Sequence, residues 1–150
     1  MLATWFCVGL LPKAPGTWGS LAALPFAWLI ASVGNPWLLP LAALLAFLVG
    51  TWAAERLERA SGDKDPGHVV IDEVAGQWMT LAVLPLAAMP LDPLLCGIGF
   101  VLFRVMDITK PWPANWLERN VSGGLGVMLD DIAAGAYAGI TLYLIAEYLL

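Results

Sequence analysis

The sequence predicts an all-α protein that is embedded in a membrane as a bundle of about five helices. Of its 150 residues, 60% are hydrophobic and 13% are charged, whereas soluble domains carry roughly 25% charged residues. The mean hydropathy is +0.78, and the apolar residues form long runs that are broken by Gly, Pro, Asn and Asp. Residues 1–150 are expected to form a single domain, because this length suits one core.

Five apolar runs are expected to form the membrane-embedded helices, and they cover residues 21–33, 37–54, 71–89, 93–106 and 127–150. Turn-forming residues at 34–36 and 90–93 join the runs into two hairpins, with the last run following alone. The first and fourth runs are shorter than the ~20 residues of a clean span. Each is therefore expected to be tilted, re-entrant or extended into the sequence beside it.

The charged residues divide unevenly between the two sides of this arrangement. All seven basic residues and ten of the twelve acidic ones fall on one side, and only Asp92 and Glu147 fall on the other. Because basic loops stay in the cytoplasm, the N-terminus is expected inside the cell and the C-terminus outside. The net charge of -5, without a basic stripe, argues against a nucleic-acid partner. The basic residues are Lys13, Arg56, Arg59, Lys64, Arg104, Lys110 and Arg119.

Two acidic pairs stand at helix ends and are predicted to face the inside of the bundle. Asp72 and Glu73 continue at helical spacing into small and polar residues at positions 76, 77 and 80. Asp130 and Asp131 continue into Ala and Gly at positions 134, 135, 138 and 139. Such a small-residue stripe lets two helix backbones approach closely, so this pair also points inward.

A third charged group, Arg104, Asp107 and Lys110, is spaced by three residues and shares one face at the end of the fourth run. Pro111 is expected to stop the helix there. The three side chains would therefore point into the same cytoplasmic vestibule as the two acidic pairs.

The acids of this vestibule predict a metal site. Several carboxylates cannot all stay ionised at close range in a partly buried place unless a cation joins them. Oxygen ligands without a Cys or His cluster favour Mg²⁺, which also binds phosphate oxygens. The predicted catalytic and metal-binding residues are Asp72, Glu73, Asp107, Asp130 and Asp131.

The bases of the vestibule, and a stretch rich in Gly and Pro ahead of the first run, predict a phosphate ligand. Arg104 can hold two phosphate oxygens at once, and Lys110 adds a point charge. Lys13, Thr17 and Ser20 surround a turn just before the first run, where a helix N-terminus leaves N–H groups for an anion. Thr17 or Ser20 could equally be a plain helix N-cap. Acids, bases and a metal together indicate phosphoryl chemistry.

Four motifs carry a family resemblance: KAPGTWGS at 13–20, VVIDEVAGQW at 69–78, FRVMDITKPWP at 103–113 and GGLGVMLDDIAAGAYA at 123–138. Together they resemble phosphatidylglycerophosphatase A over most of the chain. The resemblance implies a Mg²⁺-dependent phosphatase of the bacterial inner membrane that converts phosphatidylglycerophosphate to phosphatidylglycerol. It also implies an active site of Lys13, Thr17, Ser20, Asp72, Glu73, Arg104, Asp107, Lys110, Asp130 and Asp131.

The residues leave three alternatives open. The nucleophile is either water or a carboxylate that forms an aspartyl-phosphate. His68, the only histidine, is either a general acid or base or a plain loop residue. A small membrane transporter with an acidic ion site is the alternative to an enzyme, although a transporter's charges should lie near the midplane of the membrane.

Overall fold

Six helices make up the described part of the protein, a computed structural model that describes residues 6–7, 10, 13–62 and 69–150. No strand occurs within those residues. The prediction of an all-α protein is thus confirmed, while Lys64 and His68 lie outside the described residues. In chain order the helices are α1 (Pro15–Ser32), α2 (Leu38–Ser61), α3 (Ile71–Leu86), α4 (Pro93–Thr109), α5 (Ala114–Asn120) and α6 (Gly124–Tyr148).

Helix α1 begins earlier than its apolar run predicts. It starts at Pro15, because proline is well suited to the first turn of a helix, and Ala14 precedes it in a left-handed conformation. The expectation that Thr17 and Ser20 lie ahead of the helix is wrong, since both are inside α1. Neither residue is the N-cap, and no side chain caps this end of the helix.

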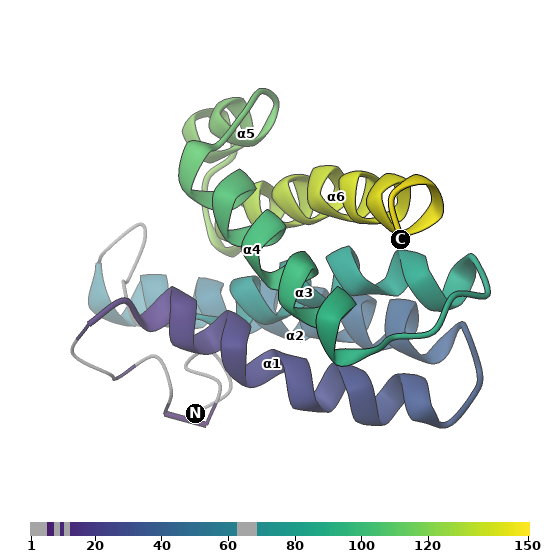
Figure 1. Ribbon diagram of the computed structural model, residues 1–150. Coiled ribbons are helices and arrows are strands. Elements are labelled where there is room, and N and C mark those ends of the chain that lie inside the picture. The colour runs from purple at the N-terminus through teal and green to yellow at the C-terminus, as the bar shows by residue number, and fades with distance from the viewer. Residues whose placement is uncertain (1–5, 8–9, 11–12, 63–68) are drawn as a thin grey trace.

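Helix α4 ends just before Pro111, as predicted, and a short helix without a counterpart among the five apolar runs follows it. Lys110 closes α4 in a left-handed conformation with φ of 43°, and Pro111 prevents the helix from continuing. The chain then forms α5, which has only seven residues. In Figure 1, α5 lies at the end of α4, and it packs against α6.

Helix α3 lies at the centre of the bundle, where it contacts α1, α2, α4 and α6. Figure 1 shows α1, α2, α3 and α6 running side by side, while α4 crosses them obliquely. Most of α3 is buried, and its Leu81 and Leu84 meet Leu142 of α6 in one apolar core. This arrangement brings the first residues of α1, α3 and α6 and the last residues of α4 to the same end of the bundle.

Glycines let α3 and α6 approach until their backbones touch. A Cβ atom added to Gly135 of α6 would lie 2.5 Å from the carbonyl oxygen of Gly76 of α3. A Cβ atom added to Gly76 would lie 2.7 Å from the carbonyl oxygen of Asp131. Both distances are too short for a real side chain, so the predicted inward-facing stripe of small residues is confirmed.

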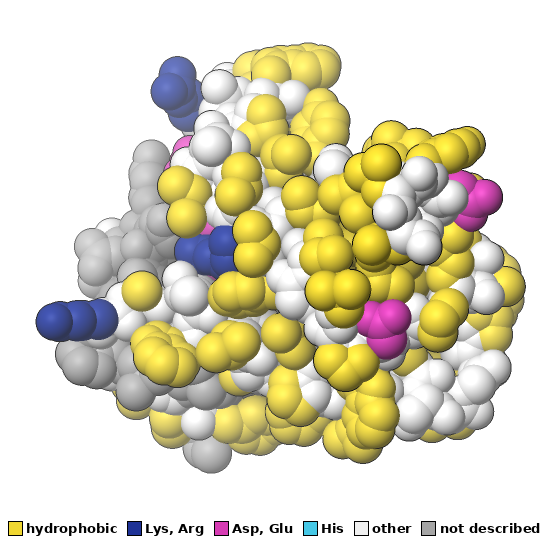
Figure 2. All heavy atoms as spheres, viewed as in Figure 1, with side chains coloured by type: hydrophobic (Ala, Val, Ile, Leu, Met, Phe, Trp, Pro, Cys, Tyr) yellow, Lys and Arg dark blue, Asp and Glu magenta, His cyan; other side chains and the backbone are white. Residues whose placement is uncertain are grey.

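The outside of the bundle is apolar. On α2, the leucines at positions 41, 44, 45 and 48 and Trp52 are each more than half exposed. Figure 2 shows hydrophobic side chains over most of the visible face, with Lys and Arg only on the side where α1 begins and where α5 lies. Helices α2 and α6 are long and apolar enough to cross a membrane. These features indicate a membrane protein, and the embedding of α1, α3 and α4 stays a prediction.

The close contact between α3 and α6 can be tested with one methyl group. Gly135→Ala should lower the melting temperature in detergent, because overpacking of a filled interface costs about 1–3 kcal/mol. Gly97→Ala is the matched control on α4, where an added Cβ atom meets nothing within 4 Å. This control should melt at or above the wild-type temperature, since Ala favours helices over Gly. Equal melting temperatures for the two variants would contradict the described packing.

Candidate active site

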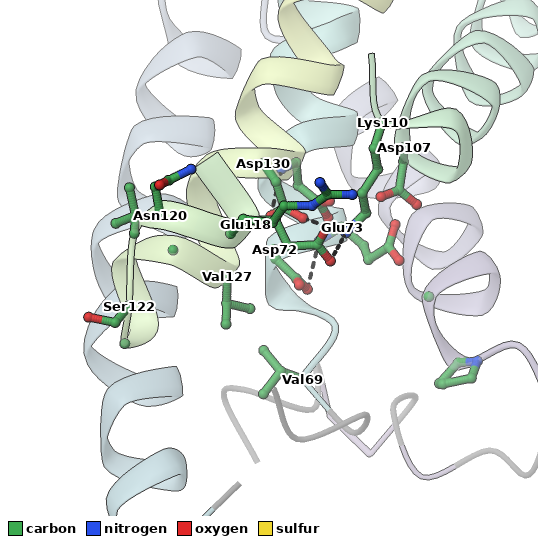
Figure 3. Close-up of a pocket in the computed structure, with 17 residues that line it drawn as sticks. Val69, Asp72, Glu73, Asp107, Lys110, Glu118, Asn120, Ser122, Val127 and Asp130 are labelled. Atoms are coloured by element: carbon green, nitrogen blue, oxygen red, sulfur yellow. Dashed lines mark hydrogen bonds and ion pairs between the residues drawn. The ribbon is translucent and has the colours of Figure 1, made fainter. Parts of the chain in front are cut away.

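A cavity of about 390 Å³ lies at the end of the bundle where the charged helix ends meet. This volume is within the ~300–1,000 Å³ of typical ligand pockets. We refer to it as the charged cavity, and Figure 3 shows its side chains converging from separate helices. It is lined by Pro15, Gly16, Val69, Asp72, Glu73, Asp107, Lys110, residues 118–123, Gly126, Val127, Asp130 and Asp131. All five acids predicted from the sequence therefore line one cavity.

Three of these acids come close enough together to share one cation. Glu73 of α3, Asp107 of α4 and Asp131 of α6 each offer a carboxylate oxygen, and these oxygens lie within 4.8 Å of one another. We refer to these residues as the acid triad. Asp131 is only 4% exposed, and its Oδ2 has no hydrogen-bond partner in the described part of the chain. An unpartnered buried carboxylate oxygen is costly, so it points to a ligand that is cationic or donates hydrogen bonds.

Arg104 holds two members of the acid triad from the side of α4. Its Nη1 forms an ion pair with Asp107 Oδ2 at 2.7 Å and another with Glu73 Oε2. Both pairs are largely shielded from solvent, because the three side chains are each less than a fifth exposed. Arg104 thus offsets the repulsion between the two carboxylates and fixes their positions.

The start of α1 supports Glu73 from the other side. The Ser20 hydroxyl lies 3.0 Å from Glu73 Oε2, to which it donates a hydrogen bond. Gly16, one turn earlier, lies so close that an added Cβ atom would be 1.9 Å from Glu73 Oε1. Ser20 therefore contacts Glu73 and does not line the charged cavity itself.

Lys110 joins the end of α4 to both α5 and α6. Its Nζ lies 2.7 Å from Asp130 Oδ2 and 2.6 Å from Glu118 Oε1. Burial alone lowers the pKa of Lys110, but the hydrogen bonds and charges of Asp130 and Glu118 outweigh it and raise that pKa above its ordinary value. Lys110 is therefore positively charged at neutral pH.

The residues that line the charged cavity differ in part from the predicted site residues. Of the five residues predicted to bind phosphate, Lys110 lines the charged cavity. Lys13, which is exposed, and Thr17, Ser20 and Arg104 are not among the lining residues, so their roles in phosphate binding stay predictions. Glu118 and Arg119 were not among the predicted site residues, yet both line the cavity. The signal that could have found them is their place between two predicted motifs, just after the proline stop at Pro111.

Comparison with known proteins identifies the family of this sequence. Residues 1–146 match the family model described as phosphatidylglycerophosphatase A. The chain belongs to the phosphatidylglycerophosphatase A family. The resemblance predicted from the four motifs is confirmed, and this family member is a phosphatase. Membership in an enzyme family decides against the transporter alternative.

Three relatives show how closely this phosphatidylglycerophosphatase A family member resembles known proteins. It is 42% identical over 149 residues to phosphatidylglycerophosphatase A of Escherichia coli, covering 99% of this chain and 83% of the relative. It is 33% identical over 150 residues to phosphatidylglycerophosphatase A of Haemophilus influenzae, covering 100% and 90%. It is 36% identical over 149 residues to a putative phosphatidylinositol-3-phosphatase of Bacteroides thetaiotaomicron, covering 95% and 89%. No solved structure matches the chain.

Asp131 should be needed for activity but not for folding. Asp131→Asn keeps the shape and removes a charge from a buried position, so the melting temperature in EDTA should stay the same or rise. Phosphate release should fall about 100-fold or more, because one charge-stabilising group typically contributes several kcal/mol at the transition state.

The matched control for this change is Asp92→Asn, at the opposite end of the bundle. Asp92 caps α4 by accepting a hydrogen bond from the Leu95 amide at 2.8 Å, and Asn is an equally good cap. This variant should keep its activity. Near-normal phosphate release by Asp131→Asn would show that Asp131 is structural.

Proposed function

We propose that this protein hydrolyses the phosphomonoester of phosphatidylglycerophosphate and releases phosphatidylglycerol and inorganic phosphate. The reaction takes place at the cytoplasmic face of the bacterial inner membrane and depends on Mg²⁺. The observation that carries the proposal is the acid triad beside Lys110 in one cavity, with Asp131 Oδ2 buried and unpartnered. The names of the relatives support a phosphomonoester on a phospholipid head group as the substrate class.

The residues fit a magnesium ion by their chemistry. The acid triad offers three carboxylate oxygens from three helices within 4.8 Å of one another, with no Cys or His among them. Hard oxygen donors of this kind suit Mg²⁺, which uses a few carboxylates and completes its shell with water and phosphate oxygens. Asp72 and Asp130 line the same cavity and complete the set of acids proposed to hold or surround the ion. When bound, the ion polarises the phosphoryl group and favours deprotonation of an attacking water.

The bases position the phosphate and stabilise its charge. Lys110 lies in the cavity lining with its ammonium group between Asp130 and Glu118, so it can approach one phosphate oxygen without leaving Asp130. Arg104 has a planar fork of five N–H donors, and its Nε has no hydrogen-bond partner in the described residues. Both cations are thus held in place before substrate binds, which is what charge stabilisation in a transition state requires.

The reaction breaks the bond between phosphorus and the glycerol oxygen. An oxygen nucleophile attacks phosphorus, the glycerol oxygen leaves with the bonding electrons, and that oxygen then takes a proton to become the hydroxyl of the product. If the nucleophile is a water molecule, inorganic phosphate forms in this one step. If it is a carboxylate of the charged cavity, water then hydrolyses the aspartyl-phosphate, which restores the carboxylate and releases inorganic phosphate. The acyl chains remain in the bilayer throughout, which explains why so polar a cavity stands at the end of an apolar bundle.

Metal dependence should be visible both in activity and in stability. Excess EDTA should abolish phosphate release from phosphatidylglycerophosphate, and added Mg²⁺ should restore it. Mg²⁺ should also raise the melting temperature of the wild-type protein, because a ligand that binds only the folded state stabilises it. The same addition should shift Asp131→Asn much less. Full turnover in excess EDTA would contradict the role of the metal.

The orientation in the membrane can be tested at the two ends of α6. Arg119→Cys and Glu147→Cys, each in a background without Cys7 and Cys96, place single thiols near the start and the end of this helix. A membrane-impermeant thiol reagent should label position 119 only from the cytoplasmic side and position 147 only from outside, as the positive-inside rule predicts. Labelling of both positions from the same side would show that α6 does not cross the membrane.

A further inference from the structure

The charged cavity extends beyond the residues that the reaction uses. Its lining continues from the acid triad to the end of α5 and the loop after it, where Arg119, Asn120 and Ser122 stand. Figure 3 shows Asn120 and Ser122 on the opposite side of the cavity from Asp107. We refer to Arg119, Asn120 and Ser122 as the outer rim. Hydrolysis of a phosphomonoester at the acid triad does not require these polar side chains.

The outer rim contains a cation, Arg119, that is not paired with a carboxylate in the described residues. Arg104 is held by Glu73 and Asp107, and Lys110 is held by Asp130 and Glu118. Arg119 also lines the cavity, but it forms no ion pair with a carboxylate in the described part of the chain. A guanidinium that is not neutralised in this way is suited to bind an anion with its fork of donors.

The neighbours of Arg119 supply groups for a hydroxyl. Asn120 donates from its Nδ2 to the backbone oxygen of Trp116 at 2.8 Å, which leaves its side-chain carbonyl as an acceptor. Ser122 adds a hydroxyl that both donates and accepts. The outer rim thus offers a cation and polar partners side by side, which suits a polyol that carries a phosphate.

Exposed tryptophans place α5 at the level of the lipid head groups. Trp112, just ahead of α5, is 72% exposed, and Trp116, within α5, is 51% exposed. Exposed Trp at the boundary between apolar and charged surface is typical of the membrane–water interface. The diester phosphates of phospholipids lie at that level, within reach of a basic residue on the same helix.

We propose that Arg119 binds the phosphodiester of the substrate, while Asn120 and Ser122 contact the hydroxyl of its head-group glycerol. The inference rests on the proposed function, since phosphatidylglycerophosphate carries a second phosphate that joins its glycerol to the diacylglycerol. The acid triad takes the terminal phosphate, and the outer rim takes the internal one. The enzyme therefore selects a head group with two phosphates over a lipid that carries a phosphomonoester alone.

The test compares two lipids with identical acyl chains in mixed micelles, phosphatidylglycerophosphate and phosphatidic acid. Arg119→Gln should lower the ratio of their kcat/KM values about tenfold, because a charge-assisted contact to only one of the two substrates is lost. The loss should appear mainly as a higher KM for phosphatidylglycerophosphate. Arg119→Lys, which keeps the charge and loses the fork, should fall between wild type and Arg119→Gln.

Arg56→Gln is the matched control, because it removes the same charge at a site outside the cavity. Arg56 lies over the Trp52 ring of α2, with its Cζ 5.5 Å from the ring centre. Its substrate ratio should equal that of the wild type. A ratio unchanged by Arg119→Gln, or an equal loss on both lipids, would overturn the inference alone. Failure of the wild type to release phosphate from phosphatidylglycerophosphate would instead overturn the proposed function.

Discussion

The contact between Gly76 and Gly135 sets the distance between the two helices that carry most of the acids. Asp131 lies one turn before Gly135 on α6, and Glu73 lies nearly one turn before Gly76 on α3. Because the helix backbones touch, these two carboxylates meet across the interface and face Asp107 of α4. A larger residue at either glycine would separate the helices and disperse the acid triad. The chemistry of the cavity thus depends on a packing contact that holds no functional group.

Arg104 and Lys110 form ion pairs between the helices that carry the acids. Arg104 joins α4 to α3 through Glu73, and Lys110 joins the end of α4 to α6 through Asp130 and to α5 through Glu118. Each cation neutralises two carboxylates that would otherwise repel one another, Glu73 and Asp107 for Arg104, and Asp130 and Glu118 for Lys110. The phosphate-binding role proposed for these two side chains is thus combined with a structural one.

Helical periodicity predicted the parts of the site that lie on long helices. The small residues that follow each acidic pair at helical spacing predict that both pairs face inward, and the packing of α3 against α6 confirms that pattern. The two pairs are Asp72 with Glu73 and Asp130 with Asp131. The part of the charged cavity that α5 lines could not be predicted in this way. Helix α5 has seven residues between a proline-rich turn and a glycine pair, too few for a hydrophobic period, so Glu118 and Arg119 had no helix to place them. The start of α1 is not evident from the sequence, because Pro15, Gly16 and Gly19 are typical of a turn.

The distribution of side-chain size on α2 inverts the usual relation between burial and tolerance to substitution. Its inward positions are mostly Ala and Gly, whereas its large leucines and Trp52 point outward. In a soluble protein, large residues fill the core and the surface varies freely. Here the outer face has only to remain apolar, so one large hydrophobic residue can replace another there with little consequence. The inner face accepts almost no increase in volume, and variation among related chains should therefore concentrate on the bulky, lipid-facing positions.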